Sequence, residues 1–139
     1  ALLIAGNPVA YAKGDALPKP DPKKTQEMSA IALGAFKRFG LKESGGYPEL
    51  RIVDRTHELL GGKRHARAVV YESGPPAIYL SRRSYNTDPG TVDEYLQHEA
   101  SHLAAWRKYG YGIKEHGKEW RDLCLAMASN RRVCKTERY

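Results

Sequence analysis

Three residues within one short segment have the types and the spacing to bind a metal ion and to move a proton. Residues 98–102 read HEASH, the pattern H-E-x-x-H. Side chains four positions apart on a helix are offset by about 40° and about 6 Å along the axis, so His98 and His102 can converge on one ion. A zinc ion accepts such ligands. The motif therefore predicts a helix-borne zinc site with Glu99 as the general base.

The position of Glu99 around the predicted helix supports this interpretation. With about 100° per residue, Glu99 falls between the side that carries His98 and the apolar side that carries Leu103. Burying a carboxylate costs several kcal/mol unless it is paired. A base held beside a cation accounts for a glutamate at this position better than a surface carboxylate does.

A hydrolytic zinc site needs a third protein ligand and an open fourth position for water. His116 is the main candidate, because it follows the turn Gly110-Tyr111-Gly112 and precedes a new helix, where the chain can fold back. Glu119 is the alternative, since some zinc sites of this class take a glutamate from the following helix. His57 and His65 lie in or beside loops of the strand region, and we expect both to be ordinary solvated histidines.

The two cysteines, Cys124 and Cys134, are too few for a four-cysteine zinc ribbon or a multi-bridge scaffold, and at most one bridge is possible. Cys124 lies about 12 Å along a helix from His116. It also shares an apolar stripe with Trp120 and Met127. We therefore expect Cys124 to be a buried, unreactive thiol rather than a ligand, and pairing with Cys134 stays open.

The surrounding sequence predicts helices and strands that follow one another in separate groups. Apolar periodicity and Gly or Pro breaks predict helices over 25–39, about 91–109 and from 118 onward, and strands over 50–54, 66–72 and 77–82. Short connections between the strands favour antiparallel hairpins. This order is typical of an α+β domain. If strand 77–82 lies at an edge, it could pair with an extended substrate.

Composition limits the class of protein. The 139 residues are 41% hydrophobic and 28% charged, as in a single globular domain. The longest apolar run, residues 1–5, is far shorter than the roughly 20 residues that span a bilayer. The net charge of +7 favours a polyanionic partner such as nucleic acid. The candidate phosphate contacts near the C-terminus are Arg131, Arg132, Lys135 and Arg138.

We divide the chain into an N-terminal arm with a proline-rich linker (1–24), a folded domain (25–129) and a basic C-terminal tail (130–139). Ala10-Tyr11-Ala12 resembles a signal-peptide cleavage site, but no basic segment precedes it. We expect a monomeric, cytoplasmic protein, with a secreted or periplasmic location as the open alternative.

Residues 98–120 resemble the signature of the SprT-like metalloproteases. The H-E-x-x-H helix is followed by a short connection and by H-G-x-x-W, here residues 116–120. Residues 78–83 and 25–39 are also similar to the family. The resemblance implies a small zincin-like α+β domain with an N-terminal helix, a three-stranded or slightly larger, mostly antiparallel sheet, and the metal helix followed by a second helix. It also implies that His98, His102 and His116 hold one Zn²⁺ per chain beside the catalytic Glu99.

The resemblance further implies a zinc-dependent endopeptidase that cleaves proteins or peptides, because members of the family degrade proteins crosslinked to DNA. Bacterial members usually continue into a four-cysteine zinc ribbon. With only Cys134 in that region, we expect a catalytic domain without the ribbon. The alternative is a non-catalytic, zinc-stabilised nucleic-acid-binding module, whose structural zinc would need four protein ligands.

Overall fold

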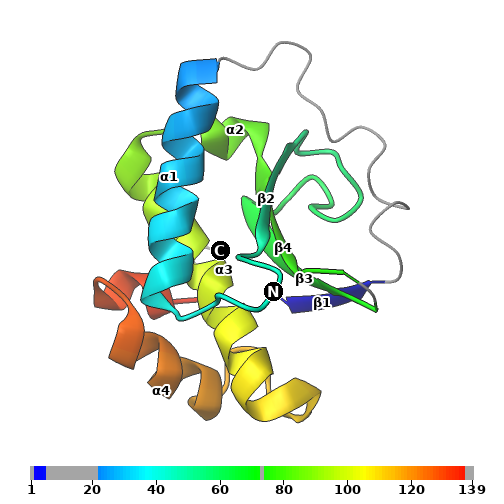
Figure 1. The fold of residues 1–139 in the computed structure, drawn as a ribbon, viewed down its shortest axis with the longest axis vertical. Coiled ribbons are helices and arrows are strands. Elements are labelled where there is room, and N and C mark those ends of the chain that lie inside the picture. The colour runs from blue at the N-terminus through cyan, green and yellow to red at the C-terminus, as the bar shows by residue number, and fades with distance from the viewer. Residues whose placement is uncertain (1, 6–21, 73, 137–139) are drawn as a thin grey trace.

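The structure is a computed structural model that describes residues 2–5, 22–72 and 74–136 (Figure 1). Its elements are β1 (Leu2–Ala5), α1 (Pro22–Arg38), β2 (Glu49–Val53), β3 (Ala66–Tyr71), β4 (Ala77–Ser81), α2 (Arg82–Tyr85), α3 (Pro89–Tyr109), the 3₁₀ helix η2 (Gly110–Gly112), α4 (Lys118–Met127) and the 3₁₀ helix η3 (Arg131–Cys134). The α+β class is confirmed, and each predicted helix and strand is present with ends shifted by a few residues.

The sheet has four strands in the order β1-β3-β4-β2, and the expected antiparallel character is wrong for most of it. β3 and β4 are antiparallel, but β1 pairs with β3 and β2 pairs with β4 in parallel. Of the expected hairpins only β3–β4 is present, and the turn at Pro75 and Pro76 precedes its second strand. Residues 54–65 form hydrogen-bonded turns and carry the chain across to the far side of β4, as a crossover between non-adjacent strands requires.

The strand order also removes one expected binding edge. β4 lies inside the sheet between β3 and β2, so it cannot accept an added strand. The edges of the described sheet are β1 and β2. Residues 2–5, which we assigned to the N-terminal arm, are thus part of the sheet, and the rest of the arm up to residue 21 lies outside the described residues.

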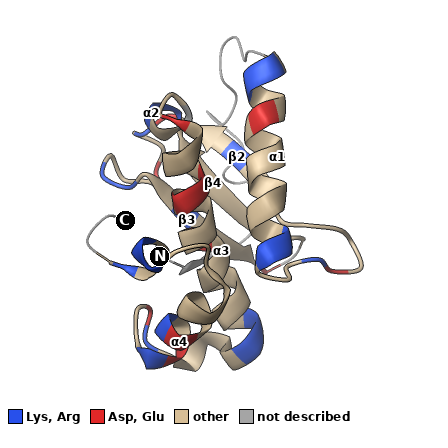
Figure 2. Cartoon of the chain, turned by 90° about the vertical axis from the view of Figure 1, so that its left-hand side faces the viewer, with Lys and Arg blue, Asp and Glu red and all other residues tan. Residues whose placement is uncertain are grey.

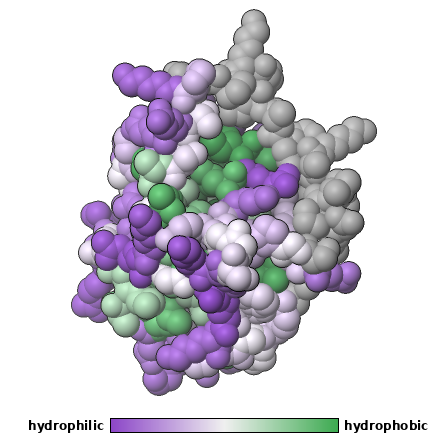
Figure 3. All heavy atoms as spheres, in the orientation of Figure 1, coloured by the Kyte–Doolittle hydropathy of each residue, from purple (hydrophilic) through white to green (hydrophobic). Residues whose placement is uncertain are grey.

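Two apolar clusters lie on opposite faces of the sheet. Helices α1 and α3 cover one face, where alternate residues such as Ile78 and Leu80 of β4 point into the main core. Ala77 and Tyr79 point to the other face and pack with Leu59 and Leu60 of the 54–65 connection. Figure 3 shows hydrophobic atoms in the region between α1 and β2, with hydrophilic residues along part of their border. β4 is therefore buried on both faces and forms the centre of the domain.

Both ends of helix α3 are well defined. The Asp88 carboxylate accepts a hydrogen bond from the Thr91 backbone N–H, and Pro89 follows the cap at the first helical position. Gly110, at a φ of 75°, ends the helix in a conformation that glycine adopts without strain. The middle of α3, including Gln97, Glu99 and Ser101, is buried among the sheet, α1 and α4.

The C-terminal part of the described chain packs on α3 rather than extending from it. Val133 and Cys134 of η3 form a third apolar cluster with Ala105, Trp120 and Cys124. Within the segment that we assigned to a C-terminal tail, η3 therefore buries apolar side chains against α3 and α4. Within the described residues, no helix combines the length and apolar character that crossing a bilayer requires.

Candidate metal centre

Three imidazoles meet between α3 and the start of α4. His98 and His102 come from successive turns of α3 and are buried, and His116 comes from the turn before α4 and is half-buried. The Nε2 atom of His102 lies 3.3 Å from Nε2 of His98 and 3.0 Å from Nε2 of His116. One ligand atom from each ring lies within 4.8 Å of the other two. This group could hold a metal ion, and imidazole nitrogens are ligands that zinc favours.

A backbone carbonyl orients His98. Its Nδ1 lies 2.7 Å from the Val133 carbonyl oxygen. Because a carbonyl only accepts, Nδ1 carries the proton and donates it, which leaves the Nε2 lone pair of a neutral ring facing the other histidines. Such an outer hydrogen bond fixes the tautomer and the ring orientation of a metal-binding histidine.

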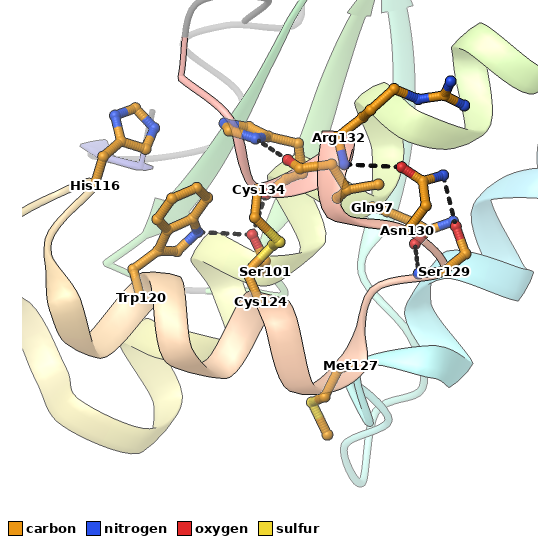
Figure 4. The surroundings of a disulfide bond; sticks show 12 residues. Gln97, Ser101, His116, Trp120, Cys124, Met127, Ser129, Asn130, Arg132 and Cys134 are labelled. Carbon is orange, nitrogen blue, oxygen red and sulfur yellow. Dashed lines mark hydrogen bonds between the residues drawn. A yellow bond between two sulfur atoms is a disulfide. The ribbon is translucent and has the colours of Figure 1, made fainter.

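Trp120 packs against all three imidazole rings. Its ring stacks on His102 at a centroid distance of 5.0 Å. With His98 and with His116 it makes T-shaped contacts. Its indole N–H donates to the Ser101 hydroxyl at 2.7 Å (Figure 4). The aromatic residue of H-G-x-x-W therefore packs against the site and restricts all three imidazoles.

Burial favours the neutral form of the three histidines, which is the form that metal binding requires. It lowers the pKa of His102 well below the ordinary value of 6.5. Burial also lowers the pKa of His98, against opposing effects of Glu99 and of the Val133 carbonyl. For His116 burial again lowers the pKa, although the neighbouring Glu115 acts in the opposite direction.

Glu99 is 1% exposed and is anchored to the sheet. Its Oε1 accepts a hydrogen bond from the Ala68 backbone N–H of β3 at 2.9 Å. The carboxylate acts electrostatically on both His98 and His116. A negative charge is thus held beside the three imidazoles by a rigid strand.

A glycine sets the approach of His116 to the site. A Cβ at Gly117 would lie 2.8 Å from the Cβ of Lys114, closer than two such atoms can approach. Its φ of −82° needs no glycine, so the requirement is steric. The glycine of H-G-x-x-W therefore lets the chain fold tightly just before α4.

The other candidate ligands lie elsewhere. The ring of His65 stacks on Tyr95 at 4.8 Å, and His57 accepts a hydrogen bond from the Leu59 backbone N–H, so both are packed rather than simply solvated. Glu119 is exposed on α4. None of them belongs to the three-histidine group found among the described residues.

Cys124 and Cys134, whose pairing the sequence left open, form a disulfide, so Cys124 is not a thiol (Figure 4). Their Cα atoms lie 5.8 Å apart, within the range that a disulfide spans. The sequence could not show that η3 turns back onto α4. Cys124 is buried, as expected, and with its sulfur in the disulfide it offers no thiolate to a metal.

Part of the predicted basic surface lines a cavity. A hollow of about 340 Å³ beside the disulfide is bordered mainly by cationic side chains, namely Arg121, Arg131, Arg132 and Lys135. Figure 2 shows Lys and Arg also at both ends of α1 and at the C-terminal end of α3. Arg138 lies outside the described residues.

Two contributors to the site were missed by the sequence reasoning. The Val133 carbonyl has no sequence signal, because every residue carries a carbonyl. The Ala68 N–H that donates a hydrogen bond to Glu99 also has no sequence signal, because it is a backbone group. A third contributor, Gly117, does have a sequence signal, because a glycine directly follows His116.

The α+β fold thus brings the two histidines of the H-E-x-x-H motif together with a third histidine, His116. The model of the SprT-like family matches residues 36–139, so the chain belongs to the SprT-like family. Protein SprT from Enterobacter sp. (strain 638) is 27% identical over 81 residues, which are 58% of this chain and 45% of that protein. The chain thus spans less than half the length of this curated relative. No solved structure matches the chain.

Proposed function

We propose that this protein is a zinc-dependent endopeptidase in which His98, His102 and His116 hold one Zn²⁺ and Glu99 is the general base. The observation that carries the proposal is the convergence of the three Nε2 atoms next to a buried carboxylate. The family supports it as well. The donor set fits zinc, because three neutral imidazoles leave a fourth position for water.

The residues of the site would have separate roles in catalysis. Bound zinc would lower the pKa of a water to about 7 and polarise the scissile carbonyl. Glu99 accepts the proton of the attacking water and later delivers it to the leaving amine. The hydrogen bond from Ala68 holds one carboxylate oxygen of Glu99 in place during both transfers. Trp120 and Val133 keep the imidazoles oriented.

A structural zinc in a binding module is the competing function, and two observations disfavour it. A structural site is closed by four protein ligands, whereas the metal-binding group in the described part of the chain has three. Both cysteines are joined in the disulfide and supply no thiolate. A buried glutamate beside the site also has no role in such a module.

The substrate would be a protein or an extended peptide, and proteins associated with DNA are the proposed class. The cationic cavity bordered by Arg121, Arg131, Arg132 and Lys135 supports contact with a phosphate backbone. A solvated basic surface without a ligand is the simpler alternative, which a DNA-binding titration tests directly.

The proposal is tested by metal analysis and cleavage together. Purified protein should contain about one zinc per chain and should cleave casein, with cleavage lost after chelation and restored by Zn²⁺. Adding a protein bound to DNA as a second substrate tests the substrate class. Zinc bound at one per chain without cleavage of either substrate would favour the binding module.

A further inference from the structure

The Cys124–Cys134 disulfide lies next to the backbone group that orients His98. The carbonyl that accepts from His98 Nδ1 belongs to the peptide bond between Val133 and Cys134. The disulfide ties that same Cys134 to α4. One end of this peptide unit is therefore covalently attached to the helix that also carries Trp120, whose ring stacks on His102.

The other contacts of η3 are weaker constraints on this carbonyl. Arg132 pairs with Glu94 at 3.2 Å, but the Arg132 side chain is 63% exposed and its ion pair is screened by water. Ser129 is bound to Gln97 of α3 through two hydrogen bonds, which fix the start of the segment rather than its end. A single 3₁₀ turn has poor hydrogen-bond geometry and little stability of its own. Beyond it, Lys135 and Thr136 are exposed.

Burial adds to the effect of the covalent bond. The side chains of Val133, Cys124 and Cys134 share one apolar cluster with Trp120 (Figure 4). Separating the two sulfur atoms would remove the tie that closes this cluster around η3. The Val133 carbonyl would then be held by packing alone at its C-terminal side.

We propose that the Cys124–Cys134 disulfide is a positioning element of the metal centre, which holds the Val133 carbonyl on His98 and so makes metal affinity depend on the redox state of the two cysteines. This inference rests on the proposed metal site. The disulfide touches neither metal nor substrate, so it acts through the orientation of His98. Outer hydrogen bonds of this kind typically contribute 10–100-fold in metal affinity.

Reduction is chemically balanced with a phosphine as the reductant. The phosphine attacks one sulfur and breaks the S–S bond, and water then supplies the oxygen of the phosphine oxide and the two protons of the new thiols. Two electrons pass to the sulfur atoms in this reaction. A phosphine that is removed by gel filtration leaves no thiol reagent to compete for the metal.

The test compares the full chain in three forms: disulfide-bonded, phosphine-reduced, and the double variant Cys124→Ala, Cys134→Ala. The double variant removes the bond without adding thiols that could themselves bind metal. The Zn²⁺ dissociation constant is measured by competition with a chromophoric chelator, and Co²⁺ absorption reports coordination geometry. We expect affinity for Zn²⁺ to fall 10–100-fold in the reduced form and in the double variant, with an altered Co²⁺ spectrum.

A matched control separates positioning from general loss of stability. Leu60→Ala removes a buried side chain on the opposite face of the sheet, in a cluster that does not include the site. It should destabilise the fold yet keep the Zn²⁺ affinity within about twofold, because it leaves the hydrogen bond to His98 intact. NMR of the imidazole nitrogens provides a second readout, in which the double variant should lose the protected Nδ1 proton of His98.

The outcomes are distinct. An unchanged Zn²⁺ affinity and His98 tautomer in the double variant would overturn the inference alone. An equal loss of affinity in Leu60→Ala would also overturn it, since stability rather than positioning would then be responsible. A disulfide-bonded chain that binds neither Zn²⁺ nor Co²⁺ would overturn the proposed function and this inference together.

Discussion

Glu99→Gln is the substitution that tests the proposed chemistry most directly. Gln has nearly the same shape as Glu, and its amide oxygen can still accept the hydrogen bond that the Ala68 N–H donates to Oε1. What it lacks is a basic oxygen. Acid–base catalysis contributes about 10² to 10⁴-fold, which corresponds to about 2.7 to 5.4 kcal/mol of activation free energy. Cleavage of casein should therefore fall at least about a hundredfold while zinc stays near one per chain.

A second substitution at the same position separates the base from the anchor. Glu99→Ala leaves the buried Ala68 N–H without its acceptor, which should cost about 1–3 kcal/mol of unfolding free energy. Glu99→Gln should unfold close to the wild type in urea. Both variants should be equally inactive, so activity and stability are lost together only in Glu99→Ala.

Glu119→Gln is the matched control, because it removes the same charge from an exposed position on α4. It should retain both zinc and activity. Full activity in Glu99→Gln would refute the role of Glu99 as the base. Loss of zinc together with activity in Glu99→Gln would instead make Glu99 a ligand or a structural anchor.

Three further predictions concern the metal, pH and DNA. His116→Ala should lose most bound zinc in metal analysis while His57→Ala retains it, and zinc retained in His116→Ala would remove His116 from the ligand set. Burial lowers the folded pKa of the three site histidines, so the unfolded chain binds more protons than the folded chain below about pH 6.5. The metal-free protein should therefore lose stability as pH falls from 6.5. Urea unfolding at pH 7.5 and 5.5 measures this loss, and equal midpoints would contradict it. Neutralising the basic C-terminal residues should weaken DNA binding and flatten its salt dependence by about 0.9 in the log–log slope for each lost phosphate contact, and an unchanged slope would show that they do not contact DNA. The residues are Arg131, Arg132, Lys135 and Arg138.

Local patterns in the sequence predicted the elements and the core of the site. The 3.6-residue periodicity of α1, α3 and α4 depends only on near neighbours, so these helices were found within a few residues. The four-residue spacing of His98 and His102 likewise determines that both face one side of α3. The resemblance that residues 98–120 carry was confirmed by the family match.

Strand pairing could not be predicted in the same way. A strand's own sequence does not say which neighbour it will meet, and the compact turns of residues 54–65 looked like a hairpin connection. The fold instead uses them to cross β4, and this made β2 parallel to β4 and placed β4 at the centre. Long-range burial on both faces of β4 decided the order.

The contacts that hold the candidate metal centre were likewise decided only by tertiary structure. The histidines of the candidate site could be predicted from the motif, because few types of side chain bind zinc. The Val133 carbonyl, the Ala68 N–H and the Cys124–Cys134 bond have no such restriction on sequence, since backbone groups are everywhere and two cysteines pair only if the fold brings them together. The sequence by itself therefore determined which side chains could meet an ion, whereas the packing of η3 and β3 against α3 determined how those side chains are held.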